Sequence, residues 1–414
     1  MNIQFINKKQ KMSFIFKLAF LVSICLSICF VSFVSAQEET IKIGCSIALT
    51  GALSREGQLG RDGYNLWMDT VNDQGGLEVN GKRYKIEIVY YDDRSEPQTS
   101  ARLAEKLISD EGIKLIFGPF SSGVTFPVSD ITERYGALLM SAMGNADMLY
   151  DRGYKNIFSI TQTPYTFMRP VLDLLSRQSP KPSTISILTK DELFSLTLAE
   201  GARDYATEID MEVVYFAKYP AGLQDLSTHI SQMKALNPDI FIATGHIVDS
   251  LLIVRQSKEL GFRTKAWDIQ VGPELPEFKE VLGKDANYTM YYTFYSDSED
   301  INWKDPVFDD TNNWKRMFEE KYGYKPNQTN GQACSTGVVL GEAIKKVGSI
   351  DPIEVRDALI EMEIETFFGP VNFDERGVNT AQGIYIYQIQ PEKDVIVYPE
   401  IFADGELLYP MPRW

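Results

Sequence analysis

The chain has 414 residues, 44% of them hydrophobic, which is enough for two or three globular domains. The net charge of −16 at pH 7 argues against a nucleic acid or an anionic membrane as a partner and mainly indicates solubility.

The first 36 residues differ from the rest of the chain. Four lysines precede an apolar stretch from about Leu18 to Val34, which ends in Val34-Ser35-Ala36. This pattern predicts a secretory signal peptide at residues 1–36, cleaved before Gln37, with an uncleaved membrane anchor as the alternative. Because the segment carries no acidic residue, its removal would change the net charge from −16 to −20. The mature chain is therefore expected to be extracytoplasmic, in the periplasm or otherwise secreted.

Two cysteines, Cys45 and Cys334, remain after the predicted cleavage. Cys45 lies in a predicted strand and Cys334 in a predicted helix, so one distant disulfide is possible, but two buried thiols are the favoured interpretation. No later segment is long and apolar enough to span a membrane.

The first part of the mature chain alternates strands with helices. Expected strands are 41–49, 84–91, 113–117 and 137–142, and expected helices are 61–72, 98–109 and 124–135. Val79-Asn80-Gly81-Lys82 predicts a hairpin turn. The turn predicted at 50–60 is rich in glycine, but Gly57, Gly60 and Gly63 do not have the spacing of a dinucleotide-binding fingerprint and are interpreted as flexible-turn glycines.

The same alternation then repeats, which indicates parallel strands joined by helices in a second, similar α/β lobe. Expected strands are 156–160, 184–188, 213–216, 239–243, 265–270 and 288–295, and expected helices are 165–178, 193–207, 226–236, 248–260, 307–322 and 332–347. The C-terminal segments 373–377, 384–389 and 395–398 predict antiparallel strands.

The stretch Gly118-Pro119-Phe120-Ser121-Ser122-Gly123 lies between a buried strand and a helix expected to begin near residues 122–124. Pro127 favours this boundary, since proline is tolerated in the first turn of a helix. Free N–H groups and two hydroxyls at the end of a buried strand could bind an anion. The alternative is that Ser121 and Ser122 only cap the helix.

No catalytic constellation is found. The chain has two histidines, His229 and His246, and its serines do not lie in a Gly-x-Ser-x-Gly elbow. Ligand spacing typical of a metal site is absent, as is a phosphate-binding loop, so neither an enzyme nor a cofactor is predicted. The pairs Asp92-Asp93 and Asp309-Asp310 are interpreted as solvated turns.

Several predicted loops follow the C-terminal ends of buried strands and carry polar or aromatic groups. Loops of this kind are expected to face one ligand-binding cleft between two lobes. They contain Ser121-Ser122, Met143-Gly144-Asn145, residues 191–194, Gly245-His246 and Gly272-Pro273-Glu274.

Motifs spread over the mature chain resemble the substrate-binding proteins of ABC transporters for branched-chain and other amino acids. They are Gly51 to Gly57, Asn72 to Leu77, Tyr91-Asp92-Asp93, Gly118 to Pro127 with Ser129-Asp130, Val271-Gly272-Pro273-Glu274, and Phe368 to Asp374.

The resemblance implies a type I periplasmic binding protein fold, in which two lobes close over a small ligand. Each lobe is a mainly parallel α/β sheet flanked by helices, and three strands cross between them, near 159–162, 288–293 and 367–371. Lobe I is expected at residues 37–158 and 287–366, and lobe II at 159–286 and 367–414.

The resemblance also implies roles for residues at the cleft. Ser122 and groups near Asn145 and Met143 would hold the ligand's α-carboxylate, with Phe120, Ser121 and Gly123 beside them. Glu274 would receive the α-ammonium; its alternative is a solvated turn glutamate. Departures from the family pattern at Phe194, His246, Asn145, Glu56 and Gly331 mean that specificity for valine or leucine cannot be carried over. A glycine at 331 would leave more room, and Glu56 could favour a polar or basic side chain.

The predicted function is capture of an amino acid or related small carboxylate and its delivery to the permease subunits of an ABC importer, by a chain expected to be a monomer. The alternative is a sensor component that presents the same ligand to a membrane receptor.

Overall fold

The first lobe is built on a six-stranded sheet with the strand order β2-β3-β1-β4-β5-β6. The structure is a computed structural model that describes residues 39–412, so the predicted signal peptide lies outside the described residues. Strands β1, β4, β5 and β6 pair in parallel, and β2 pairs with β3 in an antiparallel hairpin. The strands are β1 (Thr40–Ile47), β2 (Leu77–Val79), β3 (Lys82–Asp92), β4 (Leu115–Phe117), β5 (Leu138–Ser141) and β6 (Ile157–Ser159).

Helices follow most of these strands, as expected for parallel strands joined by crossovers. They are α2 (Ser54–Asp73), α3 (Pro97–Ser109), α4 (Ser122–Tyr135) and the short α5 (Asp147–Tyr150). The predicted hairpin turn is confirmed, with Asn80 at φ 49° and Gly81 at φ 77°, as a tight two-residue turn requires.

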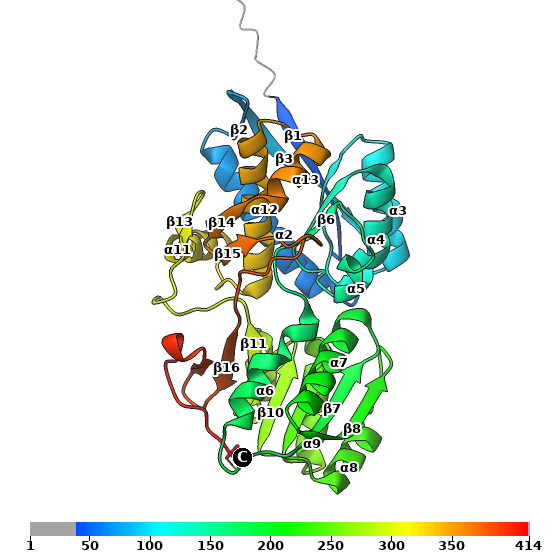
Figure 1. Cartoon of the computed structure of the whole chain (residues 1–414), viewed down its shortest axis with the longest axis vertical. Helices are drawn as coiled ribbons and strands as arrows, with labels where there is room; N and C mark the ends of the chain where they lie inside the picture. The colour runs from blue at the N-terminus through cyan, green and yellow to red at the C-terminus, as the bar shows by residue number, and fades with distance from the viewer. Residues whose placement is uncertain (1–38, 413–414) are drawn as a thin grey trace, which may run out of the picture. The chain divides into compact units, whose positions relative to one another are not determined.

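The second lobe contains a seven-stranded sheet with the order β17-β16-β11-β10-β9-β7-β8 (Figure 1). Its first five strands in the chain pair in parallel, and β16 and β17 add antiparallel, as predicted for the C-terminal segment. The strands are β7 (Thr184–Lys190), β8 (Glu212–Tyr219), β9 (Ile240–Thr244), β10 (Ala266–Gln270), β11 (Thr289–Thr293), β16 (Tyr385–Ile389) and β17 (Asp394–Tyr398), and the helices are α6 (Met168–Ser176), α7 (Leu193–Glu208), α8 (Ser227–Leu236), α9 (Ile247–Glu259) and α10 (Pro276–Leu282).

After β11 the chain contributes more helices to the first lobe. Helix α12 packs against α2 in the same direction, since Gly63 contacts Asn330 and Gly337 contacts Trp67. The elements of this region are β12 (Lys304–Asp305), β13 (Asp309–Asp310), α11 (Thr311–Tyr322), α12 (Gln328–Val347), α13 (Pro352–Ile360), β14 (Glu363–Thr366) and β15 (Gly369–Asn372); single 3-10 turns lie at Pro164–Thr166, Gly283–Ala286 and Glu400–Phe402.

The predicted α/β fold with two mainly parallel sheets is confirmed. Two of the three crossings predicted between the lobes, those near 288–293 and 367–371, differ from the structure. Strand β11 belongs to the second sheet, because its five buried residues pair with β10 and β16. The third passage lies between Val378, which pairs with Ser159, and β16, because residues 369–372 instead form a hairpin with β14. The predicted lobe boundaries otherwise stay a prediction.

The interpretation of Gly57, Gly60 and Gly63 as turn residues is wrong, because α2 begins at Ser54 and contains all three. They allow close packing within a helix. A Cβ on Gly57 would lie 1.9 Å from the carbonyl oxygen of Ala48, and one on Gly63 would lie 2.3 Å from that of Asn330.

The paired acids are also more than solvated turns. Asp93 is fully buried and accepts a hydrogen bond from the Ser95 N–H at 2.8 Å, and burial raises its pKa to about 6. Asp310 is the N-cap of α11 and accepts from the Asn313 N–H at 3.0 Å.

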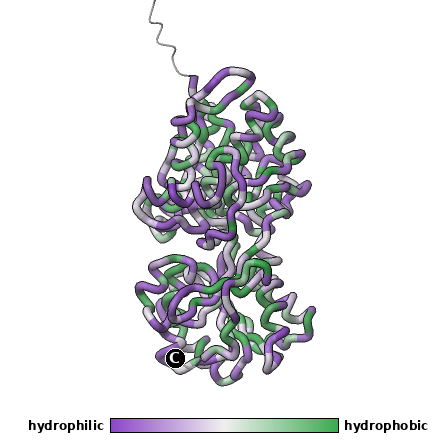
Figure 2. Tube along the Cα trace, turned by 90° about the vertical axis from the view of Figure 1, so that its left-hand side faces the viewer, coloured by the Kyte–Doolittle hydropathy of each residue, from purple (hydrophilic) through white to green (hydrophobic). Residues whose placement is uncertain are grey.

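Cys45 and Cys334 are buried free thiols, which confirms the favoured interpretation. Figure 2 shows that apolar segments lie mainly inside each lobe and polar segments mainly outside. Between residues 39 and 412, none of the helices is long and apolar enough to cross a membrane.

Candidate functional site

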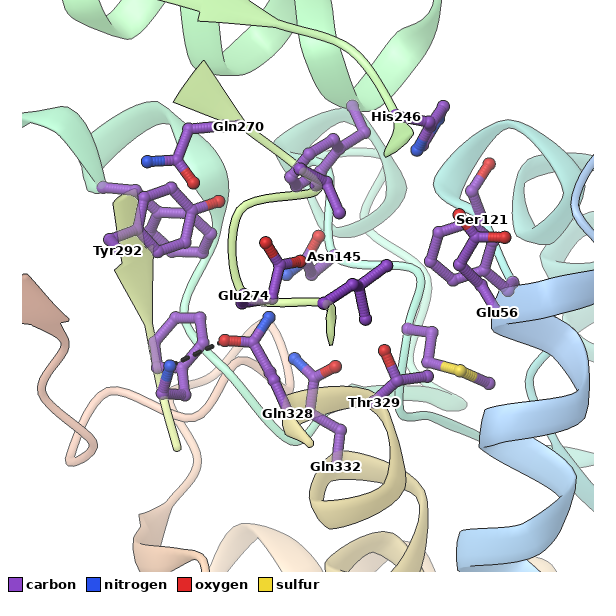
Figure 3. A pocket seen from close by; sticks show the side chains of 17 residues that line it. Glu56, Ser121, Asn145, His246, Gln270, Glu274, Tyr292, Gln328, Thr329 and Gln332 are labelled. Atoms are coloured by element: carbon purple, nitrogen blue, oxygen red, sulfur yellow. Dashed lines mark hydrogen bonds between the residues drawn. The ribbon is translucent and has the colours of Figure 1, made fainter. Parts of the chain in front are cut away.

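A small pocket with a free volume of about 50 Å³, partly open to solvent, lies where loops from both lobes meet. Figure 3 shows Glu274 and Asn145 in its middle, Glu56 and Ser121 on one side, and Gln270 and Tyr292 on the other. The lining residues are Glu56, Phe120, Ser121, Met143, Asn145, Phe167, Phe194, His246, Gln270, Val271, Glu274, Leu275, Tyr292, Phe294, Gln328, Thr329 and Gln332.

Most of the residues predicted for the site line this pocket. Phe120, Ser121, Met143, Asn145, Phe194, His246, Glu274 and Glu56 are among the lining residues, whereas Ser122, Gly123 and Gly331 are not. A Cβ on Gly331 would lie 2.6 Å from the Phe368 ring, so this glycine makes room for a packed aromatic side chain rather than for a ligand.

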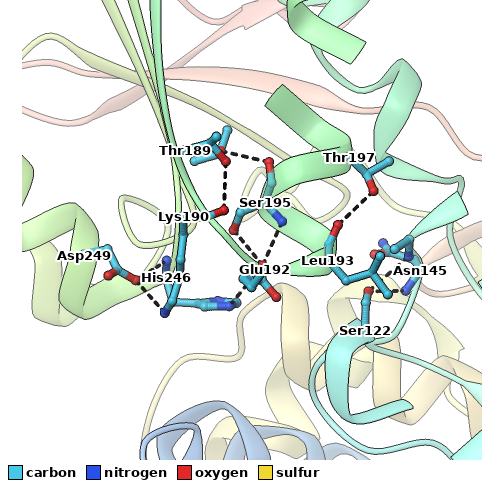
Figure 4. A network of polar contacts seen from close by, with 12 residues as sticks. Ser122, Asn145, Thr189, Lys190, Glu192, Leu193, Ser195, Thr197, His246 and Asp249 are labelled. Atoms are coloured by element: carbon cyan, nitrogen blue, oxygen red, sulfur yellow. Dashed lines mark hydrogen bonds and ion pairs between the residues drawn. The ribbon is translucent and has the colours of Figure 1, made fainter. Parts of the chain in front are cut away.

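Helix α4 begins at the pocket, as the sequence predicts. Ser121 is its N-cap, but no side-chain hydrogen bond caps the helix. The Ser122 hydroxyl oxygen is buried and accepts the N–H groups of Asn145 and Ala146, both at 3.1 Å (Figure 4). Ser122 therefore fixes the loop after β5. Pro127 lies in the second turn of the helix, beyond the first turn where it was expected.

Asn145 presents an unpaired acceptor. Its amide nitrogen donates to the Thr161 hydroxyl at 3.0 Å, and its carbonyl oxygen Oδ1 is buried without a hydrogen-bond partner. A buried acceptor without a donor is costly, so this oxygen suits a ligand N–H group.

Glu274 lies in the loop after β10 and keeps part of its surface open. Its carboxylate accepts the Gly272 N–H at 2.8 Å. Burial raises the pKa of Glu274 to about 7; the Gly272 hydrogen bond lowers it, the charge of Glu56 raises it further, and His246 lowers it. Because burial penalises the charged form, a cationic group in the pocket would stabilise this carboxylate.

His246 and Glu192 form a buried ion pair beside the pocket, with Nε2 and Oε1 3.6 Å apart (Figure 4). Glu192 also caps α7 by accepting the N–H and the hydroxyl of Ser195, both at 2.7 Å. Burial alone would raise the pKa of Glu192, but contact with His246 and the bonds from Ser195 lower it to about 2. Burial lowers the pKa of His246, and Glu192 outweighs this and raises it. The contact with Glu192 thus favours the protonated form of His246 and engages it in an ion pair.

Aromatic rings form the remaining walls. Phe167 contacts Tyr292 and Phe294 edge-on, with ring centroids 5.0 and 5.1 Å apart, and Phe120 contacts the His246 ring at 5.6 Å. These contacts combine a large apolar surface with a few polar groups, as is typical of small-molecule sites.

Sequence reasoning missed nine lining residues. Most of them follow or lie within predicted strands and helices, and only Val271 belonged to a quoted motif, without a role in the site: Phe167, Gln270, Val271, Leu275, Tyr292, Phe294, Gln328, Thr329 and Gln332. The polar members of this set, Gln270, Gln328 and Gln332, were the available signal, because glutamine is rarely buried without a partner.

Among the described residues, no group of three or more His, Cys, Asp or Glu side chains could hold a metal ion.

A sequence profile described as periplasmic binding protein matches residues 40–394. The chain belongs to the periplasmic binding protein family. This family binds solutes, and membership implies an extracytoplasmic location. The resemblance inferred from the sequence motifs is thereby confirmed.

Curated relatives include a Leu/Ile/Val-binding protein homolog 7 of Brucella suis, which is 26% identical over 386 residues, 89% of this chain and 94% of the relative. A leucine-, isoleucine-, valine-, threonine-, and alanine-binding protein of Pseudomonas aeruginosa is 27% identical over 349 residues, 83% of this chain and 88% of the relative.

Solved structures share the fold of this periplasmic binding protein. The substrate-binding protein LivJ of Streptococcus pneumoniae, in complex with isoleucine, has a TM-score of 0.76 at 20% identity, covering 90% of this chain and 100% of LivJ. A solute-binding protein of R. palustris in complex with benzoate has a TM-score of 0.73 at 19% identity, covering 91% and 98%.

Proposed function

We propose that this periplasmic binding protein captures an amino acid or a related small carboxylate in the pocket and delivers it to the permease of an ABC importer. Curated relatives named for amino acid binding support the ligand class, and structural neighbours from ABC transporters support the delivery role. The protein acts as a monomer in this scheme. A role in sensing would use the same ligand and the same pocket.

The main support for the proposal is the environment of the Glu274 carboxylate. Its carboxylate faces the pocket with one backbone donor, and the unpaired Oδ1 of Asn145 lies in the same pocket. A ligand ammonium has three N–H donors and a positive charge, so it would satisfy both acceptors at once.

The N-terminus of α4 would hold the ligand carboxylate. The N–H groups of Val124 and Thr125 donate to the Ser121 carbonyl, at 3.0 and 2.8 Å. The preceding N–H groups, of Ser122 and Gly123, have no acceptor within the helix and would serve the carboxylate, together with the positive end of the helix dipole.

Neighbours that bind benzoate or 3,4-dihydroxy benzoic acid point to a competing ligand class, a carboxylate without an amine. Glu274 favours an amino acid over that class, because only a ligand with an amine would stabilise its charged form.

Thermal-shift and calorimetric screening of the protein against amino acids and amine-free carboxylates tests the proposal. A ligand at a hundred times its dissociation constant should stabilise the fold by about 2.7 kcal/mol. Glu274→Gln should weaken amino acid binding by about 2–5 kcal/mol, because the ammonium loses its charged partner. Binding of carboxylates alone, unaffected by Glu274→Gln, would overturn the proposal.

A further inference from the structure

We infer that Glu56 forms a second cation-binding subsite, so that the preferred ligand is an amino acid with a positively charged side chain. This inference rests on the proposed function, since it takes Glu274 as the partner of the α-ammonium.

Glu56 is the third residue of α2 and lines the pocket, although its exposed fraction is only 3%. A glutamate at this helix position commonly accepts the N–H of the N-cap residue. Here that N–H, of Leu53, donates to the Ser95 hydroxyl at 3.0 Å. Among residues 39–412, no hydrogen bond or ion pair engages the Glu56 carboxylate, so capping does not explain it.

The basic side chains around the pocket are already paired with other acids. Arg55, next to Glu56 in the chain, forms an ion pair with Glu277 at 2.6 Å. His246 pairs with Glu192 at 3.6 Å, and Lys190 pairs with Asp249 at 3.0 Å. The pocket therefore presents two carboxylates, of Glu56 and Glu274, that form no ion pair with another described side chain, and the lining residue His246 is paired with Glu192 instead.

One ligand ammonium at Glu274 would leave the second carboxylate uncompensated. Figure 3 places Glu56 beside Ser121 at one side of the pocket, away from Glu274 and Asn145 in the middle. The two acids still act on each other, because the charge of Glu56 contributes to the raised pKa of Glu274. Buried charges are tolerated when paired, so a second, separate cation on the ligand fits this arrangement.

Polar groups from α12 complete the subsite. Helices α2 and α12 run in the same direction, and the Asn330 side-chain amide donates to the Leu59 carbonyl oxygen at 2.8 Å, so both helices begin at the pocket. Thr329 and Gln332 of α12 also line the pocket, and Figure 3 shows Thr329 between Gln332, below Glu274, and the side of the pocket where Glu56 lies. Their oxygen atoms can accept hydrogen bonds from the N–H groups of an ammonium or guanidinium.

Calorimetry with pairs of similar ligands tests the inference. Lysine is compared with norleucine and arginine with citrulline, in the unmodified protein, Glu56→Gln and Glu354→Gln. Glu354 is the matched control, because it also lies in the first turn of a helix, α13, but is exposed and outside the pocket. We expect the basic member of each pair to bind at least tenfold more tightly.

Glu56→Gln should abolish this preference while retaining the affinity for the neutral member, and Glu354→Gln should retain the preference. Equal affinity of the unmodified protein for lysine and norleucine, and for arginine and citrulline, would overturn the inference and leave the proposed function intact. Failure of all four amino acids, with binding of benzoate, would overturn the proposed function and the inference together.

Discussion

Glu274 combines a carboxylate, burial and an opening to the pocket, and this combination makes ligand binding sensitive to pH. In the free protein its pKa is raised to about 7, mainly by burial. A bound ammonium would favour the charged form and lower that pKa, so the proton must leave when the ligand binds.

We therefore predict that affinity for an amino acid increases as the pH rises from about 6 to 8, with up to about a tenfold change per pH unit below the free-protein pKa. The charged groups that also face Glu274 are Glu56 and His246, the latter paired with Glu192. Calorimetry near pH 6.5 in buffers of different ionisation enthalpy should detect proton release on binding.

Glu274→Gln is the control for this prediction, because it removes the titrating group and keeps the shape. An equal pH dependence in the variant would contradict the assignment. The stability of the ligand-free protein has the opposite pH dependence, because it falls as the pH rises. A glutamate in the unfolded chain has a pKa of about 4.3. Between this pH and about 7 the folded protein keeps a proton on Glu274 that the unfolded chain has lost. Glu274 therefore lowers the free energy of unfolding as the pH rises through this range.

Ser122 distinguishes a structural role from direct ligand contact. Ser122→Ala removes the acceptor of two buried N–H groups, those of Asn145 and Ala146, and should lower the free energy of unfolding by about 1–3 kcal/mol. Chemical denaturation of the ligand-free protein measures this loss.

Ser121→Ala is the matched variant, because Ser121 lines the pocket and its side chain caps nothing, so its stability should be unchanged. Unchanged stability of Ser122→Ala together with weaker binding would instead assign Ser122 to the ligand carboxylate.

Part of the pocket could be predicted from sequence for a physical reason. Loops at the carboxyl ends of parallel strands meet at one edge, so Asn145, His246 and Glu274 could be placed together from strand order alone. The direction in which each of two adjacent serines points depends on local backbone geometry, so the roles of Ser121 and Ser122 could not be separated. Gln332 lies in a helix that packs across the lobe, and only the tertiary structure brings it to the pocket.

At the scale of elements, α2 shows how glycine can serve close packing. We predict that Gly57→Ala destabilises the protein by several kcal/mol, because the added Cβ would lie 1.9 Å from the Ala48 carbonyl oxygen and the backbone must move. Thermal unfolding measures the effect.

Gly123→Ala in α4 is the control, since a Cβ there has no atom within 4 Å. It should be neutral or stabilising by up to about 1 kcal/mol, because alanine favours helix formation. Equal effects of the two substitutions would contradict the packing role of Gly57.

The type and order of most elements follow from the sequence. Buried strands such as β4 and β9 are mainly apolar runs followed by helices, and the Asn80-Gly81 pair is typical of a tight hairpin turn. The start of α2 could not be predicted, because glycine disfavours a helix locally. The glycines Gly57 and Gly63 are explained only by their close contacts with Ala48 and Asn330, which the tertiary structure creates. The membership of β11 in the second sheet also could not be predicted, because β11 pairs with β16, which lies nearly a hundred residues later in the chain.

At the scale of the whole molecule, the Arg55–Glu277 ion pair connects α2 of the first lobe with α10 of the second. The side chains are 42% and 37% exposed, so the pair should contribute only about 0.2–1 kcal/mol. It should act on ligand release, because opening of the pocket must break it.

We predict that Arg55→Ala accelerates ligand dissociation by up to about fivefold, which corresponds to the upper end of that energy range. Stopped-flow fluorescence measures the rate, and high salt should reduce the difference. Arg316→Ala is the control, because its partner Glu320 lies on the same helix. An equal change in both variants would contradict a role in holding the lobes together.

The proposed function depends on recognition of the amine of an amino acid by Glu274 of this periplasmic binding protein. The most direct measurement is calorimetric titration of the unmodified protein with amino acids and with the same molecules lacking the α-amine. We expect the amino acids to bind and loss of the amine to weaken binding by about 2–5 kcal/mol, which is at least thirtyfold. Equal or tighter binding of the amine-free carboxylates would contradict it.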